Sequence, residues 1–460
     1  MKTKKLLCLV LLGLSSFSYA ADDGWKTLFN GKDLSGFTQL NGKAPFFVKD
    51  GCIVGKSVKG EPNSFLATTE TFKDFILEFE VKCDTSLNSG VQFRSESLPT
   101  YQNGRVHGYQ CEIDPSDRAW SGGVYDEARR GWLASLENNP EGQKAYKKHG
   151  WNKYRIEADG NMIRIWLNGV NTANLYDNET PDGFIAFQVH GIGNSKPWQE
   201  GKEIQWRNIR IITDEVSSNL KKGKLAQSIN KVPNTLSEDE VAQGWILLFD
   251  GKSTQGWRGA HKESFPELGW KVKDGVLSVQ KSDGGESTNG GDIVFDKDLK
   301  AFELKVDFKI TEGANSGIKY FVTEKEKQKG SAFGLEYQIL DDAKHPDAKL
   351  FTTYEGSRTL ASLYDLKKAS GKRFNGVGKW NEARIIVYPD NRVEHWLNGF
   401  KVLEYTRGSD DYRKLVQGSK YAASNYNEAG LFGEAEVGRI LLQDHGDEVS
   451  FRNIKLRVLE

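Results

Sequence analysis

The chain has 460 residues, and its 63 basic and 63 acidic residues give a formal charge of zero. This balance argues against a broad nucleic-acid-binding surface or a binder of anionic membranes. With 38% apolar and 27% charged residues, the composition is that of a chain with folded cores, neither disordered nor membrane-embedded. The 48 glycines and the scarcity of long helical periods favour many strands joined by tight turns.

The N-terminus has the three-part layout of a secretory signal. Lys2, Lys4 and Lys5 precede a short apolar run at residues 6–14, and small residues follow up to Ala20. We therefore expect a signal peptide at residues 1–20 and an exported protein, periplasmic or at the cell surface. The apolar run is too short for a spanning helix, and no other stretch is long enough. An uncleaved or lipid-linked anchor is the alternative.

Three cysteines remain after the signal: Cys52, Cys83 and Cys111. Their number is odd and no C-x-x-C spacing occurs. The pattern therefore indicates neither a disulfide framework nor a zinc site.

The most informative feature of the sequence is an internal duplication. The paired segments, in the same order in both halves, are 24–32 with 244–252, 48–51 with 272–275, 88–90 with 315–317, 125–126 with 364–365, 166–169 with 396–399, and 188–191 with 443–446. A repeat this long indicates two whole domains, which we place at residues 24–212 and 243–460. In the linker at 213–242, Ser237 and Glu240 have the spacing of a capping box, which predicts a short helix.

Each copy reads as antiparallel β-structure. Apolar and polar residues alternate over residues 75–82 and again over 302–310, as in strands with one buried face. The dipeptides Asn168-Gly169 and Asn398-Gly399 follow strand-like runs and predict tight hairpins. Strands at this spacing predict an all-β fold, two tandem two-sheet sandwiches of the jelly-roll kind.

One strand in each copy carries a row of polar side chains. In the first copy Gln110, Glu112 and Asp114 alternate with Tyr109, Cys111 and Ile113, so the polar set shares one face. In the second copy Glu336 and Gln338 take the same places. Neighbours on such a face lie ~6.5–7 Å apart, a spacing suited to a single sugar ring. A solvated sheet face is the alternative.

A second polar pair lies near the end of each copy. Gln188 and His190 share a face, and Gln443 and His445 repeat the arrangement. Histidine titrates near neutral pH, which suits proton transfer; a structural histidine at a strand end is the alternative. No second histidine has ligand spacing, so we predict no metal ligands, although an ion such as calcium is not excluded.

Arginines and aromatic residues complete the candidate sites. Arg129 and Arg358 lie close to the repeated Tyr-Asp pairs, and Arg94 should point the same way as Glu112 if their strands are neighbours. Each could hydrogen-bond sugar oxygens or stabilise an enolate, or simply pair with acids in a loop. Trp120 and Trp132 lie in the candidate loops and suit stacking on a sugar face.

The strings at residues 108–115, 121–127 and 129–132 resemble the 3-keto-disaccharide hydrolase family, and those at 334–341 and 393–399 resemble another branch of it. The resemblance covers nearly the whole chain after the signal. It implies a concanavalin A-like fold in both copies and the cleavage of glycosides already oxidised at C3. A C3 ketone acidifies the hydrogen on C2, so that a base can form an enolate and expel the C1 oxygen.

For this chemistry we assign His190 as the base, Glu112 as the acid or second base, and Arg129 or Arg94 as the enolate stabiliser. His445, Glu336 and Arg358 are the counterparts in the second copy. The residues expected to bind the substrate are Arg94, Gln110, Asp114, Trp120, Tyr125, Gln188, Gln338, Tyr364 and Gln443.

No cofactor is predicted, and no nicotinamide-binding fingerprint is present. A separate enzyme would therefore carry out the oxidation at C3. The alternatives are a lectin-like protein without activity, or one enzymatic domain beside a substrate-gathering one. The acid stands one same-face position apart in the two copies, so equal activity of both domains is not implied.

Overall fold

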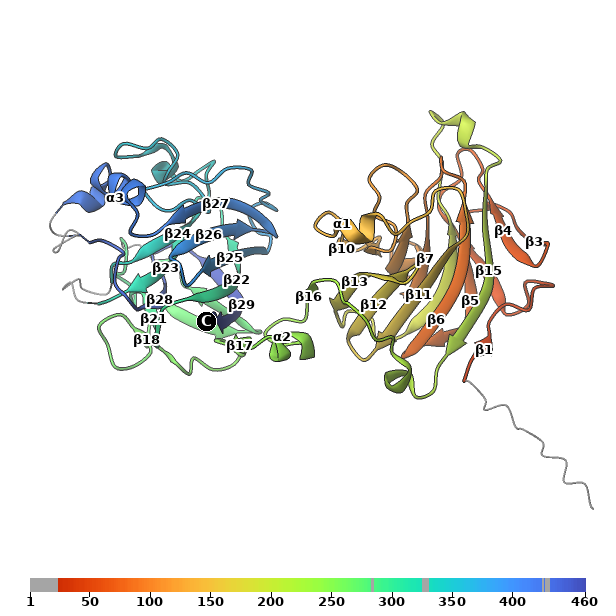
Figure 1. The fold of residues 1–460 in the computed structure, drawn as a ribbon, viewed down its shortest axis with the longest axis horizontal. Helices are drawn as coiled ribbons and strands as arrows, with labels where there is room; N and C mark the ends of the chain where they lie inside the picture. Colours follow the sequence, from red (N-terminus) through yellow and green to blue (C-terminus); the bar gives the residue numbers. More distant parts are fainter. Residues whose placement is uncertain (1–23, 283–284, 325–330, 424–425, 427–430) are drawn as a thin grey trace, which may run out of the picture. The chain divides into compact units, whose positions relative to one another are not determined.

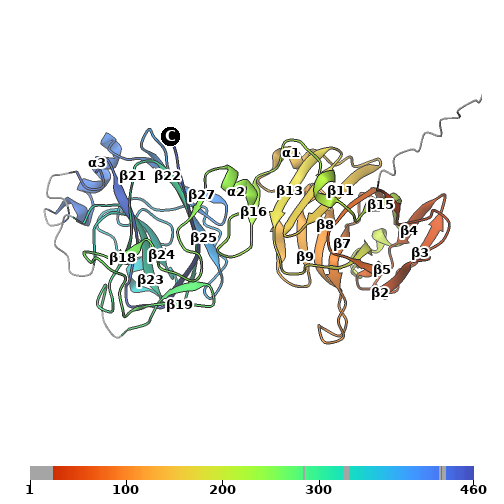
Figure 2. The same cartoon turned by 90° about the horizontal axis from the view of Figure 1, so that it is seen from below.

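The computed structural model describes residues 24–282, 285–324, 331–423, 426 and 431–460. The predicted signal peptide lies outside these residues. The chain divides into two compact units between Ile229 and Asn230, and each unit is built from two β-sheets (Figures 1 and 2). No helix in the described ranges is long and apolar enough to cross a membrane.

The first unit has a larger and a smaller sheet. In its described residues the larger sheet has nine strands, in the order β16 (Ser228–Asn230), β13 (Val170–Tyr176), β12 (Met162–Leu167), β11 (Asn152–Asp159), β6 (Phe75–Cys83), β15 (Glu203–Ile212), β4 (Cys52–Lys56) and β3 (Phe46–Lys49), with β1 (Lys26–Thr27) on β15. The seven-stranded sheet has the order β10 (Gly131–Ala134), β9 (Val124–Glu127), β8 (His107–Ile113), β7 (Ser89–Glu96), β14 (Gly183–Val189), β5 (Ser64–Phe72) and β2 (Phe37–Asn41). Its one short α-helix among those residues is α1 (Pro140–Gln143).

The second unit repeats this plan. Counted over its described residues, the larger sheet has eight strands, in the order β19 (Trp270–Lys273), β20 (Val276–Val279), β29 (Val449–Val458), β22 (Phe302–Ile310), β25 (Asn381–Val387), β26 (Arg392–Leu397) and β27 (Phe400–Thr406), with β17 (Ile246–Leu247) on β29. The five-stranded sheet has the order β18 (Trp257–Gly259), β21 (Ile293–Leu299), β28 (Gly438–Leu442), β23 (Asn315–Val322) and β24 (Leu335–Leu340). The helices α2 (Glu238–Ala242) and α3 (Asp410–Gln417) lie outside the sheets (Figure 1).

A hydrophobic core fills the space between the two sheets of each unit, which confirms the predicted sandwich. In the first unit Tyr109, Cys111 and Ile113 are fully buried in this core. Tyr337 and Ile339 take the same places in the second. The polar residues that alternate with them therefore point away from the core, as the period of two predicts.

The outer face of β6 differs from its prediction. The alternation there indicated a face turned to water, but Ile76 and Glu78 are both buried. Ile76 packs against Val216, in the segment that follows β15. Glu78 is held in ion pairs with Arg155 and Arg210, at 3.2 and 2.7 Å. An alternation of apolar and polar residues indicates that one face of a strand is buried. It cannot show whether another segment of the chain covers the second face.

The predicted turns are confirmed. Asn168 and Gly169 have φ values of 48° and 92°, and Asn398 and Gly399 have values of 50° and 82°, so both hairpins use the left-handed conformations that Asn-Gly favours. The linker helix α2 begins with the expected capping box of Ser237 and Glu240. The three cysteines that follow the signal are free, buried thiols.

A bulge interrupts β7 and its counterpart β23 at equivalent residues. Arg94 and Phe321 have positive φ values of 44° and 54°, and the pairing register of each strand shifts there. The neighbouring strand meets each bulge with a glycine. A Cβ on Gly183 would lie 2.4 Å from the backbone oxygen of Ser95, and a Cβ on Gly438 would lie 2.4 Å from Cα of Phe321.

We therefore expect Gly183→Ala to lower the free energy of unfolding by about 1–3 kcal/mol, the usual cost of overpacking against atoms that cannot move aside. Urea denaturation of the full chain measures this difference. Gly150→Ala is the matched control, because a Cβ at Gly150 meets nothing within 4 Å. Equal stability of the two variants would contradict the close approach at the bulge.

Candidate functional site

In the first domain the outward-facing acid, Glu112, is buried and held by side-chain donors. Its Oε1 accepts a hydrogen bond from Asn88 Nδ2 at 2.7 Å, and its Oε2 accepts one from Gln110 Nε2 at 3.0 Å. Burial raises the pKa of Glu112 to about 7, against the lowering effect of these donors and of Arg118. The site can therefore hold this carboxyl group near the midpoint of its titration at neutral pH.

Arg118 covers the acid from the loop after β8. Its guanidinium lies 2.7 Å from Asp114 and 3.3 Å from Glu112. It also lies over the rings of Trp120 and Trp132, with 4.8 and 5.0 Å from Cζ to the ring centroids. The two tryptophans are half-buried and meet edge to face. Together these groups form a cation–aromatic cap beside the carboxyl group.

The neighbouring polar residues of the first domain follow the predicted face. Gln110 accepts a hydrogen bond at 2.7 Å from Gln92 of the adjacent strand. Tyr125 is the direct cross-strand partner of Gln110 and packs on Trp132, so it shares this face. Gln188 is fully buried, and neither of its amide atoms has a partner among the described residues.

His190 is exposed, and its Nδ1 lies 2.8 Å from the carbonyl oxygen of Gly191. No hydrogen bond or ion pair found among the described residues joins it to Glu112. The structure thus places the predicted base on the surface, in contact with its own turn.

The expected orientation of Arg94 is wrong. Its guanidinium binds the backbone oxygens of Lys73 and Gly160 and the carboxylate of Asp74, and the side chain is 1% exposed. The cause is the bulge in β7: the positive φ of Arg94 breaks the alternation, so this side chain leaves the face that Gln92 shares with Gln110.

Arg129 is also absent from the carboxyl group's side of the sheet. It donates to Asp126 at 2.8 Å and to Thr180 at 2.6 Å. Asp126 is the cross-strand partner of Tyr109, which faces the core. Paired residues in a sheet point to the same side, so the contact of Arg129 with Asp126 lies on the opposite face from Glu112. The expected position of Arg129 beside that acid is therefore wrong.

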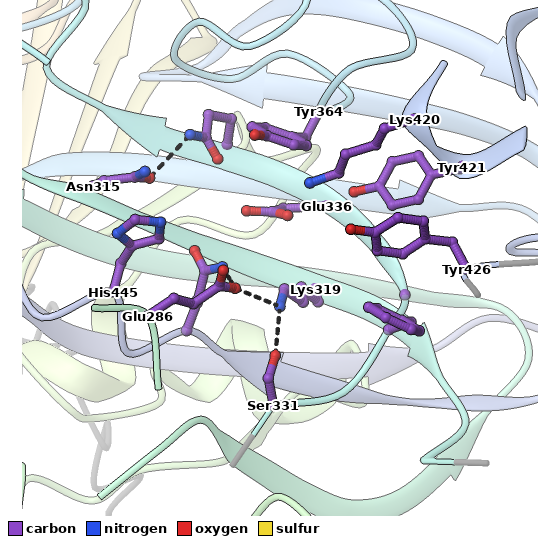
Figure 3. A pocket seen from close by; sticks show the side chains of 14 residues that line it. Glu286, Asn315, Lys319, Ser331, Glu336, Tyr364, Lys420, Tyr421, Tyr426 and His445 are labelled. Carbon is purple, nitrogen blue, oxygen red and sulfur yellow. Dashed lines mark hydrogen bonds and ion pairs between the residues drawn. The ribbon is translucent and has the colours of Figure 1, made fainter. Parts of the chain in front are cut away.

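The second domain has an open pocket over the equivalent strands (Figure 3). The space enclosed by its lining residues is about 550 Å³, including open solvent at the mouth. The lining residues are Glu286, Asn315, Lys319, Ser331, Phe333, Gly334, Glu336, Gln338, Tyr364, Lys420, Tyr421, Tyr426, Gln443 and His445. Five of them, Glu336, Gln338, Tyr364, Gln443 and His445, were predicted from the sequence.

Glu336 lies at the centre of this pocket, between two lysines (Figure 3). Burial raises its pKa to about 7, while the charges of Lys319 and Lys420 act in the opposite direction. Gln338 Nε2 donates to Oδ1 of Asn315 at 3.0 Å, and the opposite orientation of the same amide would donate to Oε1 of Glu336 at 2.9 Å. The acid and the amide have exchanged places relative to Glu112 and Gln110, as the cross-strand register confirms.

Lys319 comes from β23, directly opposite Glu336. Its Nζ lies 3.3 Å from a carboxylate oxygen of Asp292 and 3.3 Å from Ser331 Oγ. Burial acts to lower the pKa of Lys319, but Asp292, Glu336 and Glu286 outweigh it and raise the pKa to about 12. Lys319 is therefore a permanent positive charge in the pocket. The first domain has the neutral Gln92 at this register.

The second lysine, Lys420, comes from the 3₁₀ turn η4 (Lys420–Ala422) that follows α3. Its Nζ lies 4.4 Å from the ring centroid of Tyr364, and burial lowers its pKa despite the nearby Glu336. Its backbone N–H donates to Asp365 at 2.8 Å. Lys420 therefore reaches the pocket from a segment, residues 407–437, whose counterpart in the first copy is only 177–182.

Arg358 stands behind the pocket wall. It binds Asp365 at 2.8 Å and Asp347 at 3.1 Å, and it lies over the ring of Tyr364. The Tyr364 hydroxyl donates to Asp347 at 2.9 Å. Arg358 thus holds Tyr364 in place, and it does not line the pocket as its predicted catalytic role requires.

His445 and Glu286 lie on the same side of the pocket (Figure 3), and Gln443 also lines it. Gln443 Nε2 donates to Glu286 Oε1 at 2.8 Å. Burial acts to raise the pKa of Glu286, but the charges of Lys319, His445 and Lys420 lower it. Glu286, Lys420 and the tyrosines beside Lys420 were not predicted from the sequence. The long insertion before β28 was an available signal for Lys420 and these tyrosines, but not for Glu286.

Comparison with known proteins agrees with this architecture. A family model described as the 3-keto-alpha-glucoside-1,2-lyase-like domain matches residues 24–212 and 244–457. The chain belongs to this family and carries two copies of its domain. A Bacteroides thetaiotaomicron protein named 3-keto-disaccharide hydrolase is 39% identical over 237 residues, which cover 48% of this chain and 80% of that protein.

Two solved structures of glycosyl hydrolase candidates from Parabacteroides distasonis are also similar. The first is 33% identical, with a TM-score of 0.42, covering 50% of this chain and all of that one. The second is 25% identical, with a TM-score of 0.35, covering 47% of this chain and 99% of that one.

The raised pKa of Glu336 predicts a pH-dependent stability. Its pKa rises from the ordinary 4.5 to about 7 on folding, so between these values the folded protein keeps a proton that the unfolded chain has lost. The stabilising contribution is complete below about pH 4.5 and is lost as the pH rises through 7. At about 1.4 kcal/mol per pKa unit it amounts to about 3 kcal/mol.

Glu336→Gln should remove this contribution, because the amide stays neutral at every pH. Urea unfolding of wild type and variant at pH 5 and pH 8 isolates it from Glu112, which titrates in both proteins. The variant should gain stability relative to the wild type at pH 8. An identical pH dependence in the two proteins would contradict the raised pKa.

Proposed function

We propose that the second domain cleaves glycosides that carry a ketone at C3, by removing the C2 proton and eliminating the C1 oxygen. The observation that carries the proposal is the position of Glu336. This carboxyl group has a pKa of about 7 and lies in an open pocket between Lys319 and Lys420. The family membership and the name of the Bacteroides relative support the same substrate class.

The chemistry follows from the ketone. The C3 carbonyl acidifies the hydrogen on C2, so a base of pKa near 7 can remove it and leave an enolate. The C1–O bond then breaks as the C1=C2 double bond forms, and the departing oxygen takes up a proton. Water that adds at C1 completes a hydrolysis; without this addition the reaction is a lyase reaction.

We assign Glu336 as the base that takes the C2 proton and returns it to the departing oxygen. Lys319 and Lys420 supply positive charge for the enolate oxygen, since both flank the acid. Charges already held in place by the protein stabilise the enolate without any rearrangement of water as it forms. These lysines replace the arginines expected from the sequence. His445 lines the same pocket, but Glu336 is the group placed between the two cations.

The first domain is proposed to bind carbohydrate without cleaving it. Gln92 and Gln110 stand where the second domain has Lys319 and Glu336. Arg118, the cation beside the acid of the first domain, is paired with Asp114 and Glu112. The specific observation that favours binding is the half-buried cluster of Trp120, Tyr125 and Trp132 beside the carboxyl group. Aromatic faces of this kind stack on sugar rings.

The cellular context is proposed from the sequence. The signal-like start at residues 1–20 supports export to the periplasm or the cell surface. The chain lacks a nicotinamide fingerprint, so a separate enzyme would supply the C3-oxidised sugars.

The reaction is tested with purified full-length protein and 3-keto-lactose or 3-keto-trehalose, by monosaccharide release. We expect turnover of the keto sugars and none of the unoxidised disaccharides. Glu336→Gln should lower kcat by about 10²–10⁴-fold, the usual contribution of a positioned general base. Lys420→Met should lower kcat by about 10²-fold, because it removes one of two stabilising charges.

Glu112→Gln is the matched change in the first domain and decides which copy is active. Activity close to wild type in this variant fits a catalytic second domain, whereas its loss would move the reaction to the first. Silence of the wild type on both keto sugars, with binding of unoxidised oligosaccharides, would replace the proposal with a lectin-like function.

A further inference from the structure

Three potential metal ligands converge in the second domain beside the pocket. They are His345, His445 and Asp447, and one ligand atom from each lies within 4.8 Å of the other two. All three residues are half-buried. His445 also lines the pocket that contains Glu336, so the cluster borders this pocket through one of its three residues.

The topology explains why residues so far apart in the chain meet. His345 follows β24, and His445 and Asp447 follow β28, while β23 lies between these two strands in the sheet. Gly446 separates His445 from Asp447 with a φ of 82°, and its N–H donates to Asp444 at 3.0 Å. This tight turn brings both residues to the same end of the sheet as His345.

The cluster is partly oriented by hydrogen bonds outside it. Asp447 Oδ2 accepts a bond from the backbone N–H of Asn315 at 3.0 Å, which leaves Oδ1 for a ligand. The His345 and His445 rings are nearly perpendicular, with centroids 6.1 Å apart. Bonds of about 2.0–2.2 Å to one tetrahedral ion place donor atoms about 3.3–3.6 Å apart. Side-chain rotations that shorten the separations of up to 4.8 Å by about 1 Å therefore close the site.

His345 gives up little on binding. Its Nδ1 accepts a bond from the backbone N–H of Asp347 at 3.1 Å, near the long end of the hydrogen-bond range. Coordination through Nδ1 replaces this bond and leaves the ring proton on Nε2.

We propose that His345, His445 and Asp447 bind one divalent first-row transition-metal ion, such as Zn²⁺. Two imidazoles and one carboxylate suit these ions, whereas Mg²⁺ and Ca²⁺ prefer all-oxygen sites. Three protein ligands leave coordination positions open, and an ion held beside the pocket through His445 could polarise a carbonyl or hydroxyl oxygen of a bound sugar. His445 is then a ligand, which agrees with Glu336 as the base.

The first domain provides an internal comparison. It keeps the histidine, as His190, but Ile192 occupies the place of Asp447, and the loop at residues 115–123 contains no histidine. That loop instead supplies Arg118, which pairs with Glu112 and Asp114. The first domain thus retains one of the three proposed metal ligands. In place of a metal ion it has a cationic side chain, Arg118, beside its acid.

The test measures Zn²⁺ binding to tag-free, full-length protein after dialysis against a chelator, by isothermal titration calorimetry. We expect one ion per chain with micromolar or tighter affinity. His345→Asn and Asp447→Asn should each weaken binding at least tenfold. Both variants keep an oxygen that can accept the existing backbone hydrogen bond, so the local fold is preserved, and circular dichroism checks this.

Co²⁺ provides an independent spectroscopic measurement, because its visible absorption should report a protein-bound ion in the wild type and be lost in His345→Asn. His190→Ala, in the first domain, should bind Zn²⁺ as the wild type does. Absence of binding to the wild type, or binding by both Asn variants with wild-type affinity, overturns the proposal. This result is independent of sugar cleavage, so the metal site and the proposed reaction can fail separately.

Discussion

Both domains depend on one constraint: a carboxyl group is buried on the outward face of the smaller sheet. A buried carboxylate is costly unless donors or cations satisfy it. Strands β8 and β24 carry a carboxyl group and an amide at the same two positions of the sheet, in exchanged order. The side chains around them then decide whether the acid is held in a closed network or left facing an open pocket.

The two domains meet this constraint differently. Glu112 is held by Asn88, Gln110 and the overlying Arg118. Glu336 faces an open pocket and is balanced by two lysines on separate segments. In both cases burial raises the pKa of the acid to about 7. The second arrangement combines such a carboxyl group with two lysines and an open pocket.

The strands, hairpins and polar rows were predictable, because backbone geometry fixes which side chains share a face. The arginines were not. Arg94 leaves its face through a bulge with positive φ, a local irregularity that alternation cannot reveal. Arg129 forms an ion pair with Asp126 on the opposite side of the sheet from Glu112. Arg358 forms one with Asp365 behind the pocket wall. A long, flexible arginine side chain can pair with any buried carboxylate within its reach, and only the fold shows which carboxylate that is.

The sequence by itself determined the duplication, the β-sandwich class, the family resemblance and the exchange of acid and amide between the copies. These features are written in local patterns and in the spacing between them. Only the tertiary structure decided which groups surround Glu336, since Lys420 comes from an insertion and Glu286 from a distant loop. It alone also brought His345 to His445, because loops gain their neighbours from the sheets that carry them and not from their order along the chain.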